Sequence, residues 1–325
     1  MSQNKLKILF FGSGTFAAPI LRKLLTIDNY DICGVVTQPD RPSGRRKEMT
    51  AVPVKKLLDE NGFASEKIFQ PDKIKDEYVQ ILNKAKPDLI LVADYGQILP
   101  ESLLDFPQYK SINIHASLLP KWRGAVPINA AILAGERTTG ITFMRMTAGL
   151  DEGPMLSRRE VPISEQDNRA TLELSLAQQA GDMLADVIDG WVNGLLVEQP
   201  QDNSLATYAP ASLISKDKAK FSVDVTPEEL QRLVRGMYPW PVAWCNISLE
   251  GKQKRLKVYR ADIDKDLNNA DSSEKPGNIF KNSGRLFLRL NEGNIELLEL
   301  QLEGLKRMQA SSYLYLSSLE ETYIL

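Results

Sequence analysis

Histidine and cysteine are almost missing from this sequence. Its 325 residues contain one histidine, His115, and two cysteines, Cys33 and Cys245, which lie far apart along the chain. Two cysteines are too few for a disulfide framework or a cysteine-based zinc site, and they are typical of a reducing compartment. A single histidine also excludes the metal motifs that need paired histidines. We therefore predict a cytoplasmic protein without a metal site.

Long apolar runs and a strong charge of one sign are missing as well. No stretch approaches the roughly 18 apolar residues of a membrane helix. The start of the chain, MSQNKLKILFFGSG, has only a short apolar run and no signal-peptide pattern, so we expect a buried first strand there. The formal net charge of −2 provides no global positive field for a nucleic acid. Nucleic-acid binding would therefore depend on local basic clusters.

The first 190 residues alternate between strand-like and helix-like segments. Apolar runs predict strands at residues 7–12, 30–38, 88–96, 111–117 and 139–146. Helical periodicity appears at residues 15–27, 52–62, 125–135 and 168–194. This alternation predicts parallel βαβ units with helices on both faces of the sheet, an α/β fold.

The chain changes character after this region. Residues 191–207 are polar with little periodicity, and we predict a linker there. Residues 226–237 predict a helix with Thr226 as N-cap, Pro227 in the first position and Glu229 completing a capping box. Short β-like runs with glycine turns follow, typical of a small barrel or sandwich. The predicted domains are residues 1–190 and 208–325.

A glycine-rich turn follows the first predicted strand. Gly12, Gly14 and Ala17 have the spacing of a dinucleotide-binding turn. Such a site needs an acidic residue at the end of the second strand, and that strand ends in GVVTQ. The pattern therefore favours a structural turn over NAD binding.

The lone histidine lies in a short polar constellation. Asn113 and His115 are two residues apart on a predicted strand, so their side chains share one face. Asp151 lies in a glycine-flanked loop after the next strand, which we expect at the same sheet edge. Asn113 and His115 could donate to a developing oxyanion while Asp151 holds the imidazole. The alternatives are a structural histidine and an ordinary turn aspartate, and Ser117 lacks the surroundings of a nucleophilic serine.

Longer motifs connect this constellation to a known family. NIHASLLP at 113–120, KWRGAVP at 121–127 and GLDEGPM at 149–155 resemble the signature of 10-formyltetrahydrofolate-dependent formyltransferases. The similarity continues over nearly the whole chain, in TQPDRPSGRRK at 37–47, DYGQILP at 94–100, LISKDKAK at 213–220, YPWP at 238–241 and GLKRM at 304–308. This resemblance implies a Rossmann-like N-terminal domain that binds no dinucleotide, followed by an OB-like β-barrel C-terminal domain.

The resemblance also implies an activity and a set of site residues. The expected reaction moves a formyl group from 10-formyltetrahydrofolate to the methionine α-amino group of initiator methionyl-tRNA. Asn113, His115 and Asp151 match the family's catalytic trio. The residues expected to bind folate are Ser117, Leu118, Leu119 and Pro120, together with the loop of Tyr95, Gly96, Gln97, Ile98 and Leu99. Asp94 and Gln97 replace residues that are commonly apolar in the family, which leaves their folate contacts open.

Basic clusters are the sequence features that could bind RNA. The resemblance implies that Arg41, Arg45, Arg46 and Lys47 contact the tRNA acceptor end, and a proline-restricted loop of this kind suits phosphate contacts. Residues 251–260 hold further bases, although ordinary solvated strand faces would explain them equally well. We expect a monomer, because no apolar stripe demands a partner.

Three alternative functions remain at this stage. The chain could formylate a small amine such as a purine-pathway ribonucleotide or a nucleotide sugar, act as an NAD-dependent dehydrogenase, or bind RNA without catalysis. The added C-terminal domain weighs against the first, the missing acid against the second and the intact trio against the third.

Overall fold

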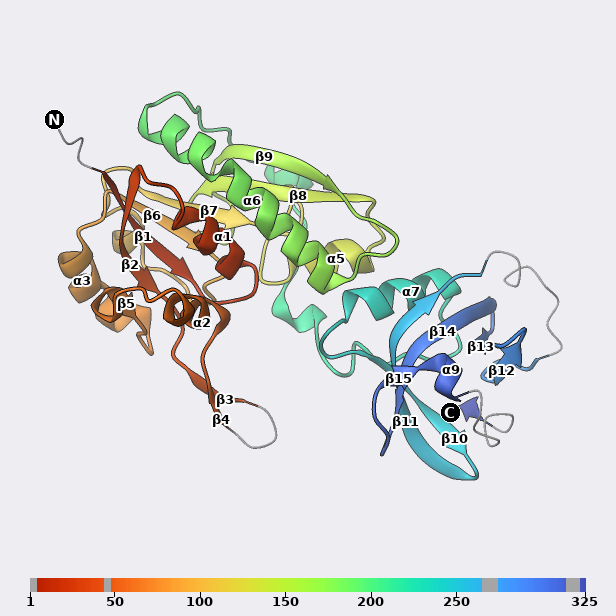
Figure 1. The fold of residues 1–325 in the computed structure, drawn as a ribbon. Coiled ribbons are helices and arrows are strands. Elements are labelled where there is room, and N and C mark those ends of the chain that lie inside the picture. Colours follow the sequence, from red (N-terminus) through yellow and green to blue (C-terminus); the bar gives the residue numbers. More distant parts are fainter. Residues whose placement is uncertain (1–4, 44–47, 265–273, 314–321) are drawn as a thin grey trace. The chain divides into compact units, whose positions relative to one another are not determined.

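The chain folds into two compact units. The computed structural model describes residues 5–43, 48–264, 274–313 and 322–325 (Figure 1). Unit 1 comprises Met1–Pro127, Thr138–Pro162 and Leu172–Pro210, and unit 2 comprises Ile128–Arg137, Ile163–Thr171 and Ala211–Leu325. The boundary is therefore crossed several times along the chain.

Unit 1 is built on a seven-stranded sheet with the order β5-β2-β1-β6-β7-β8-β9. In this order, β5, β2, β1, β6 and β7 are parallel to one another. Strand β8 pairs antiparallel with β7, and β9 pairs antiparallel with β8. The strands are β1 (Leu6–Gly12), β2 (Tyr30–Val36), β5 (Ile68–Phe69), β6 (Leu89–Ala93), β7 (Ser111–His115), β8 (Thr138–Arg145) and β9 (Met155–Pro162). A separate hairpin pairs β3 (Arg41–Ser43) with β4 (Glu48–Thr50).

The direction of β8 corrects the expectation of parallel βαβ units throughout. The expected crossover helix, α5 (Pro127–Leu133), forms between β7 and β8 in the chain but belongs mostly to unit 2. Hydrophobic periodicity predicts a strand but does not specify its direction. Strand β9 was missed because three successive exposed residues, Arg158, Arg159 and Glu160, interrupt the apolar alternation.

Helices cover both faces of the unit 1 sheet. Helices α3 (Ile74–Ala85) and α4 (Glu101–Leu104) pack on one face, against strand residues that include Leu9, Phe11 and Ile90. Helices α1 (Ala17–Leu24) and α6 (Arg169–Val192) run side by side across the opposite face, where Lys23 forms an ion pair with Asp182 (Figure 1). The remaining helices of this unit are α2 (Pro53–Glu60), η1 (Ser65–Lys67) and η2 (Asn203–Leu205).

Unit 2 is an antiparallel β-barrel. Its sheet has the order β12-β13-β14-β11-β10-β16, and β15 pairs with β14. The backbone amides of Ile279 and Ile324 donate to the carbonyls of Thr322 and Gly277, which joins β16 to the start of β12 and closes the ring. The strands are β10 (Ala243–Leu249), β11 (Lys252–Asp262), β12 (Ile279–Asn282), β13 (Arg285–Leu290), β14 (Gly293–Leu302), β15 (Met308–Gln309) and β16 (Tyr323–Ile324). The helices are η3 (Ala211–Leu213), α7 (Pro227–Gly236) and α9 (Ala310–Tyr313).

The helix α7 begins as its sequence predicts. The Thr226 side chain accepts from the Glu229 amide and the Glu229 carboxylate accepts from the Thr226 amide, so both halves of the capping box are present. Leu230 and Val234 on its buried side pack into the barrel core. Both predicted architectures, the Rossmann-like sheet and the OB-like barrel, are therefore confirmed.

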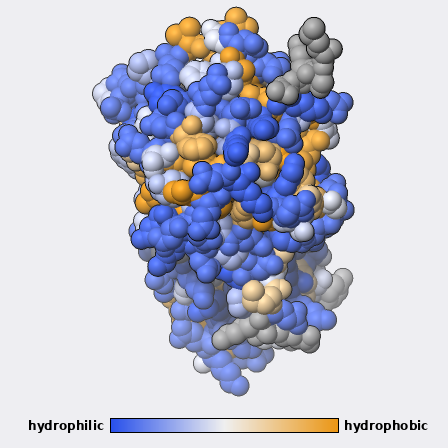
Figure 2. Space-filling model, turned by 90° about the vertical axis from the view of Figure 1, so that its left-hand side faces the viewer, coloured by the Kyte–Doolittle hydropathy of each residue, from blue (hydrophilic) through white to orange (hydrophobic). Residues whose placement is uncertain are grey.

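Within the described parts of the chain, no helix is long and apolar enough to cross a membrane. The face drawn in Figure 2 is mostly hydrophilic, with smaller hydrophobic patches between the polar side chains.

Candidate active site

The side chains of Asn113, His115 and Asp151 meet at the end of β7. The Nδ2 atom of Asn113 donates to Oδ1 of Asp151 over 3.3 Å. The Nδ1 atom of His115 lies 3.7 Å from Oδ2 of the same carboxylate. The sequence-predicted trio therefore forms one contiguous cluster.

Asp151 reaches this cluster by a different route from the one expected. Because β8 is antiparallel to β7, it ends opposite Ile112 rather than at the carboxyl end of β7. The β8–β9 connection then turns back, with Asp151 in the left-handed region at a φ of 50°. Aspartate tolerates that conformation better than bulky residues do. Gly153 makes the turn possible, since a Cβ atom there would lie 1.9 Å from the Arg145 carbonyl oxygen.

Backbone groups orient the imidazole and the carboxylate. The Nε2 atom of His115 lies 3.0 Å from the Trp122 carbonyl, which can only accept, so Nε2 carries a proton. The Gly124 amide donates to Oδ2 of Asp151 over 2.9 Å. Trp122 has a φ of 63°, a conformation that is unusual for a bulky residue and is found mainly where surrounding contacts impose it.

This arrangement suits an oxygen that gains negative charge. His115 is only 6% exposed, and both of its ring nitrogens face oxygen atoms of the protein. The Asn113 amide has a second N–H beyond the one directed at Asp151. Hydrogen-bond donors held in a partly buried site stabilise an oxyanion because they need little reorganisation.

The two segments expected to bind folate differ in what they expose. Ser117 is fully buried and its hydroxyl donates to the Lys121 carbonyl, while Leu119 is fully buried against Met144 and Met155. Leu118 and Pro120 are half-buried. In this segment, only Leu118 and Pro120 present side-chain surface.

The loop after β6 also contains both buried and exposed residues. Tyr95 and Leu99 point into the core beneath α3 and α4, and burial raises the pKa of the Tyr95 phenol. The Gln97 side chain accepts from the Ile74 amide and donates to the Asp72 carbonyl. Gly96 is exposed, and the Ile98 side chain is 91% exposed. Gly96 and Ile98 therefore form the accessible tip of this loop.

The glycine turn after β1 is closed by Asp94. The amides of Ser13 and Gly14 donate to the Asp94 carbonyl, so they do not form a free cradle for a pyrophosphate. A Cβ atom at Gly14 would lie 1.8 Å from Oδ2 of Asp94, which places a carboxylate over the turn. An acceptor and a negative charge at this position disfavour a dinucleotide, which supports the structural interpretation of the turn.

The basic residues expected to meet tRNA are only partly described. Arg41 is exposed on β3, while Arg45, Arg46 and Lys47 lie outside the described residues. On β11, Lys252 and Arg255 are exposed, and the Arg255 guanidinium lies 4.2 Å from the centroid of the Trp244 ring. Among the described residues, no group of histidine, cysteine, aspartate or glutamate could hold a metal ion.

Comparison with known proteins identifies the family. Residues 5–188 match the model of the formyl transferase family, and residues 213–316 match the model of its C-terminal domain. The chain belongs to the formyl transferase family.

Relatives of this formyl transferase match it over almost its full length. The methionyl-tRNA formyltransferase of Geotalea uraniireducens is 41% identical over 312 residues, covering 95% of this chain and 94% of the relative. The methionyl-tRNA formyltransferase of Bacillus subtilis is 39% identical over 310 residues, covering 94% of this chain and 93% of the relative. The family assignment therefore extends to both units.

Solved structures share the formyl transferase fold at lower identity. HypX from Aquifex aeolicus in complex with tetrahydrofolic acid aligns with a TM-score of 0.63 at 15% identity, covering 96% of this chain and 47% of that one. WlaRD, a sugar 3N-formyl transferase solved with dTDP and 5-N-formyl-THF, aligns with a TM-score of 0.60 at 18% identity, covering 94% of this chain and 100% of that one. At these identities the likeness concerns the fold alone.

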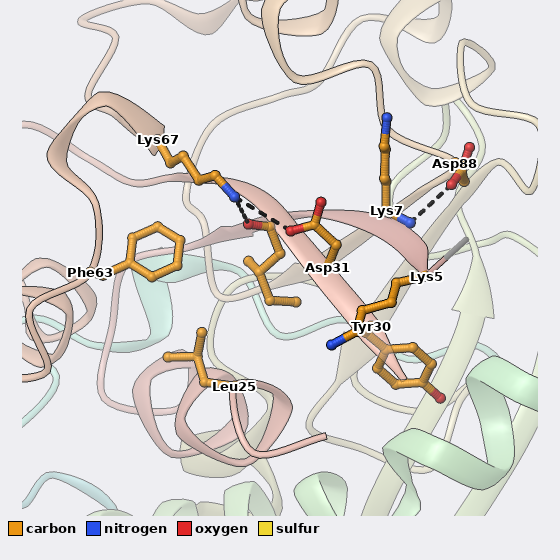
Figure 3. Close-up of a pocket in the computed structure, with 9 residues that line it drawn as sticks. Lys5, Lys7, Leu25, Tyr30, Asp31, Phe63, Lys67 and Asp88 are labelled. Atoms are coloured by element: carbon orange, nitrogen blue, oxygen red, sulfur yellow. Dashed lines mark hydrogen bonds and ion pairs between the residues drawn. The ribbon is translucent and has the colours of Figure 1, made fainter. Parts of the chain in front are cut away.

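A cavity in the formyl transferase lies away from the trio. Its volume is about 610 Å³, and it opens at the amino ends of β1, β2 and β6, the edge opposite to the end of β7 (Figure 3). In its lining, Lys67 forms an ion pair with Asp31, and the Asp88 carboxylate accepts from the backbone amide of Lys7. The lining residues are Lys5, Lys7, Leu25, Tyr30, Asp31, Ile32, Phe63, Lys67 and Asp88.

Sequence reasoning missed four residues that support the trio. Trp122, Arg123 and Gly124 lie in the quoted KWRGAVP motif, but their spacing did not indicate a role. Gln201 lies in the segment predicted as a linker, where polar composition gave no reason to single it out. The structure holds this segment against unit 1, where Gln199 and Met155 exchange backbone hydrogen bonds.

Proposed function

We propose that this formyl transferase moves the formyl group of 10-formyltetrahydrofolate to the α-amino group of methionine on initiator methionyl-tRNA. The observation that carries the proposal is near-full-length similarity, at about 40% identity, to methionyl-tRNA formyltransferases. The geometry of Asn113, His115 and Asp151 supports it, because the cluster supplies the donors that acyl transfer needs.

The reaction forms one bond and breaks another. The neutral α-amino nitrogen attacks the formyl carbon, and an α-amino group with a pKa of about 7.7–8.0 is partly neutral near pH 7. The carbonyl oxygen becomes an oxyanion in the tetrahedral intermediate. The bond from the formyl carbon to the folate nitrogen then breaks, and the proton lost by the amine ends on that nitrogen.

The proposed trio acts on the oxygen and on the proton. Asn113 donates its second N–H to the oxyanion, and His115, when protonated at Nδ1, donates from that nitrogen, which lies 3.7 Å from Oδ2 of Asp151 and so beyond hydrogen-bond distance. Each donor is worth on the order of 100- to 1,000-fold in rate. Asp151 keeps the imidazole oriented and helps to move the proton from the amine to the folate nitrogen. Neither step requires a metal ligand or a nucleophilic serine from this chain.

The folate and tRNA contacts are part of the proposal. Leu118, Pro120, Gly96 and Ile98 offer the exposed surface for folate, while Ser117, Leu119, Tyr95, Gln97 and Leu99 support it from behind. Residues 1–190 would catalyse, residues 191–207 would connect, and residues 208–325 would bind tRNA. Arg41, Arg45, Arg46 and Lys47 would contact its acceptor end. We also propose a cytoplasmic monomer, which agrees with the mostly hydrophilic face in Figure 2.

One assay tests the function. Purified protein is incubated with 10-formyltetrahydrofolate and charged initiator tRNA, and formyl-methionine is measured after hydrolysis of the ester. Free methionine and an amino-sugar nucleotide serve as alternative acceptors. We expect efficient transfer to the charged tRNA alone. Preferred transfer to the amino sugar would instead support a small-amine formyltransferase.

A further inference from the structure

The Asp151 turn is held from behind by a second polar cluster. The Nε2 atom of Gln201 donates to the Asp151 carbonyl over 2.9 Å and to the Gly153 carbonyl over 2.7 Å. Both N–H groups of this amide are therefore used by the backbone on either side of Glu152.

Gln201 is itself fixed by a buried arginine. The Arg123 side chain is 2% exposed, and its Nε and Nη2 atoms donate to Oε1 of Gln201 over 3.1 and 2.8 Å. Nη2 also donates to Oδ1 of Asn203 over 2.8 Å. This pair of donors fixes which end of the Gln201 amide faces the turn.

The segment that carries Gln201 is anchored on both sides. Glu198 forms an ion pair with Arg145 at the end of β8. Gln199 exchanges backbone hydrogen bonds with Met155 at the start of β9 over 2.8 and 2.9 Å. Gln201 therefore reaches the turn from a fixed backbone.

We propose that Gln201 is a positioning residue, which, with Arg123, holds the Asp151 turn so that its carboxylate faces His115. The turn needs such support because Asp151 adopts a left-handed conformation and Gly153 imposes little restriction of its own. The inference rests on the proposed function, in which Asp151 acts on His115. A displacement of about 1 Å at a reacting group can lower a rate about 100-fold.

The substitution Gln201→Glu separates positioning from folding. It keeps an oxygen that accepts from Arg123 and adds a second negative charge beside that buried guanidinium, which already lies 3.9 Å from the Glu152 carboxylate. It also replaces the amide donor by a carboxylate that the Asp151 and Gly153 carbonyls repel. We expect kcat to fall about 10- to 100-fold, while KM for each substrate changes by less than about threefold. We expect the melting temperature to shift by less than about 5 °C.

Two further variants give the comparison. Val197→Ala shortens a side chain on the same segment that is 77% exposed, and we expect kcat to stay within about twofold of the wild type. Gln201→Met keeps the side-chain length but removes both donor and acceptor, and we expect the same loss of kcat as in Gln201→Glu. It replaces Gln201→Glu in the comparison if the carboxylate prevents folding.

A double-mutant cycle shows whether Gln201 acts through Asp151. Single-turnover rates are measured for Gln201→Glu, Asp151→Asn and the double variant. We expect the double variant to be no slower than Asp151→Asn, because a misplaced turn has no effect once its carboxylate is gone. If the rate losses of the two single variants multiply in the double variant, or if kcat is unchanged in Gln201→Glu, the positioning role of Gln201 is overturned. The proposed function would not be affected by either result. A wild type inactive on charged initiator tRNA would overturn the proposed function as well.

Discussion

The Nδ1 atom of His115 lies 3.7 Å from Oδ2 of Asp151, and a single turn of three residues fixes this pair. The Trp122 carbonyl accepts from the far nitrogen of the imidazole, and the Gly124 amide donates to the carboxylate. Both backbone groups depend on positive φ angles, 63° at Trp122 and 121° at Gly124. Between them, the buried Arg123 ties the turn to Gln201. The histidine–aspartate geometry is therefore a property of this turn as much as of β7.

Removal of the Asp151 charge should reduce the rate while leaving the fold intact. Asp151→Asn keeps an oxygen that can accept from the Gly124 amide but no longer places a negative charge beside His115. We expect kcat for formyl transfer to fall about 100- to 1,000-fold, with KM changed far less. Steady-state kinetics with formyl-folate and charged initiator tRNA measures this. Asp182→Asn, at a side chain that is 62% exposed on α6, is the matched control. A near-wild-type kcat in Asp151→Asn would remove Asp151 from the mechanism.

Crowding at the glycine turn should make Gly14 and Asp94 interdependent. Gly14→Ala places a methyl group 1.8 Å from the present position of the Asp94 carboxylate, so that side chain has to move. We expect the free energy of unfolding to fall by about 1–3 kcal/mol, measured by urea denaturation. In an Asp94→Gly background, which removes the carboxylate and suits the φ of 47°, the same substitution should cost much less. Equal costs in both backgrounds would show that the contact with Asp94 is not the cause.

Arg41 should contribute to tRNA affinity through a phosphate contact. Loss of one such contact lowers the slope of log affinity against log salt by about 0.7 to 0.9. We therefore expect Arg41→Ala to raise KM for charged tRNA at low salt and to flatten its salt dependence by that amount. Formylation kinetics over a salt series measures both quantities. Lys75→Ala removes an exposed charge on α3 and should leave the slope unchanged; an Arg41→Ala slope equal to that of the wild type would count against the loop.

The half-buried thiol of Cys33 should destabilise the fold at alkaline pH. Burial in β2, assisted by the nearby Asp31 carboxylate, raises the pKa of this thiol from 9.0 to about 12. The folded state thus binds the proton more tightly than the unfolded state does. The resulting stabilisation is complete below about pH 9 and is lost as pH rises towards about 12.

Comparison with Cys33→Ala isolates this effect from the other groups that titrate at high pH. Between pH 9 and 11, the unfolding free energy of the wild type should fall more steeply than that of the variant, by at most about 1.4 kcal/mol per pH unit. Urea denaturation at each pH provides the free energies. Parallel curves for the two proteins would show that Cys33 does not contribute.

Local features of the sequence were enough to predict most elements of the fold. The apolar runs at residues 7–12, 30–38, 88–96 and 111–117 became β1, β2, β6 and β7, since burial on both faces requires continuous hydrophobicity. The capping box at Thr226 could also be predicted from the sequence, because its two hydrogen bonds join residues three positions apart. Periodicity failed for β9, where exposed charges lie on an edge strand.

The candidate site, like the fold, could be predicted from the sequence only in part. Asn113 and His115 could be placed together from the sequence, because alternate residues of a strand share a face. Their meeting with Asp151 was expected for the wrong reason, as β8 runs antiparallel and the connection to β9 has to turn back. The roles of Trp122, Gly124 and Gln201 depend on positive φ angles and contacts between distant segments, which composition does not specify.

The sequence by itself therefore determined the two architectures, the family and the identity of the polar trio, because hydrophobic pattern and contiguous motifs are local properties of a chain. Only the tertiary structure decided how Asp151 reaches His115 and which groups hold it there. Those contacts join β7, the turn at Trp122, the β8–β9 connection and the segment around Gln201, whose proximity follows from strand direction and packing rather than from any local pattern.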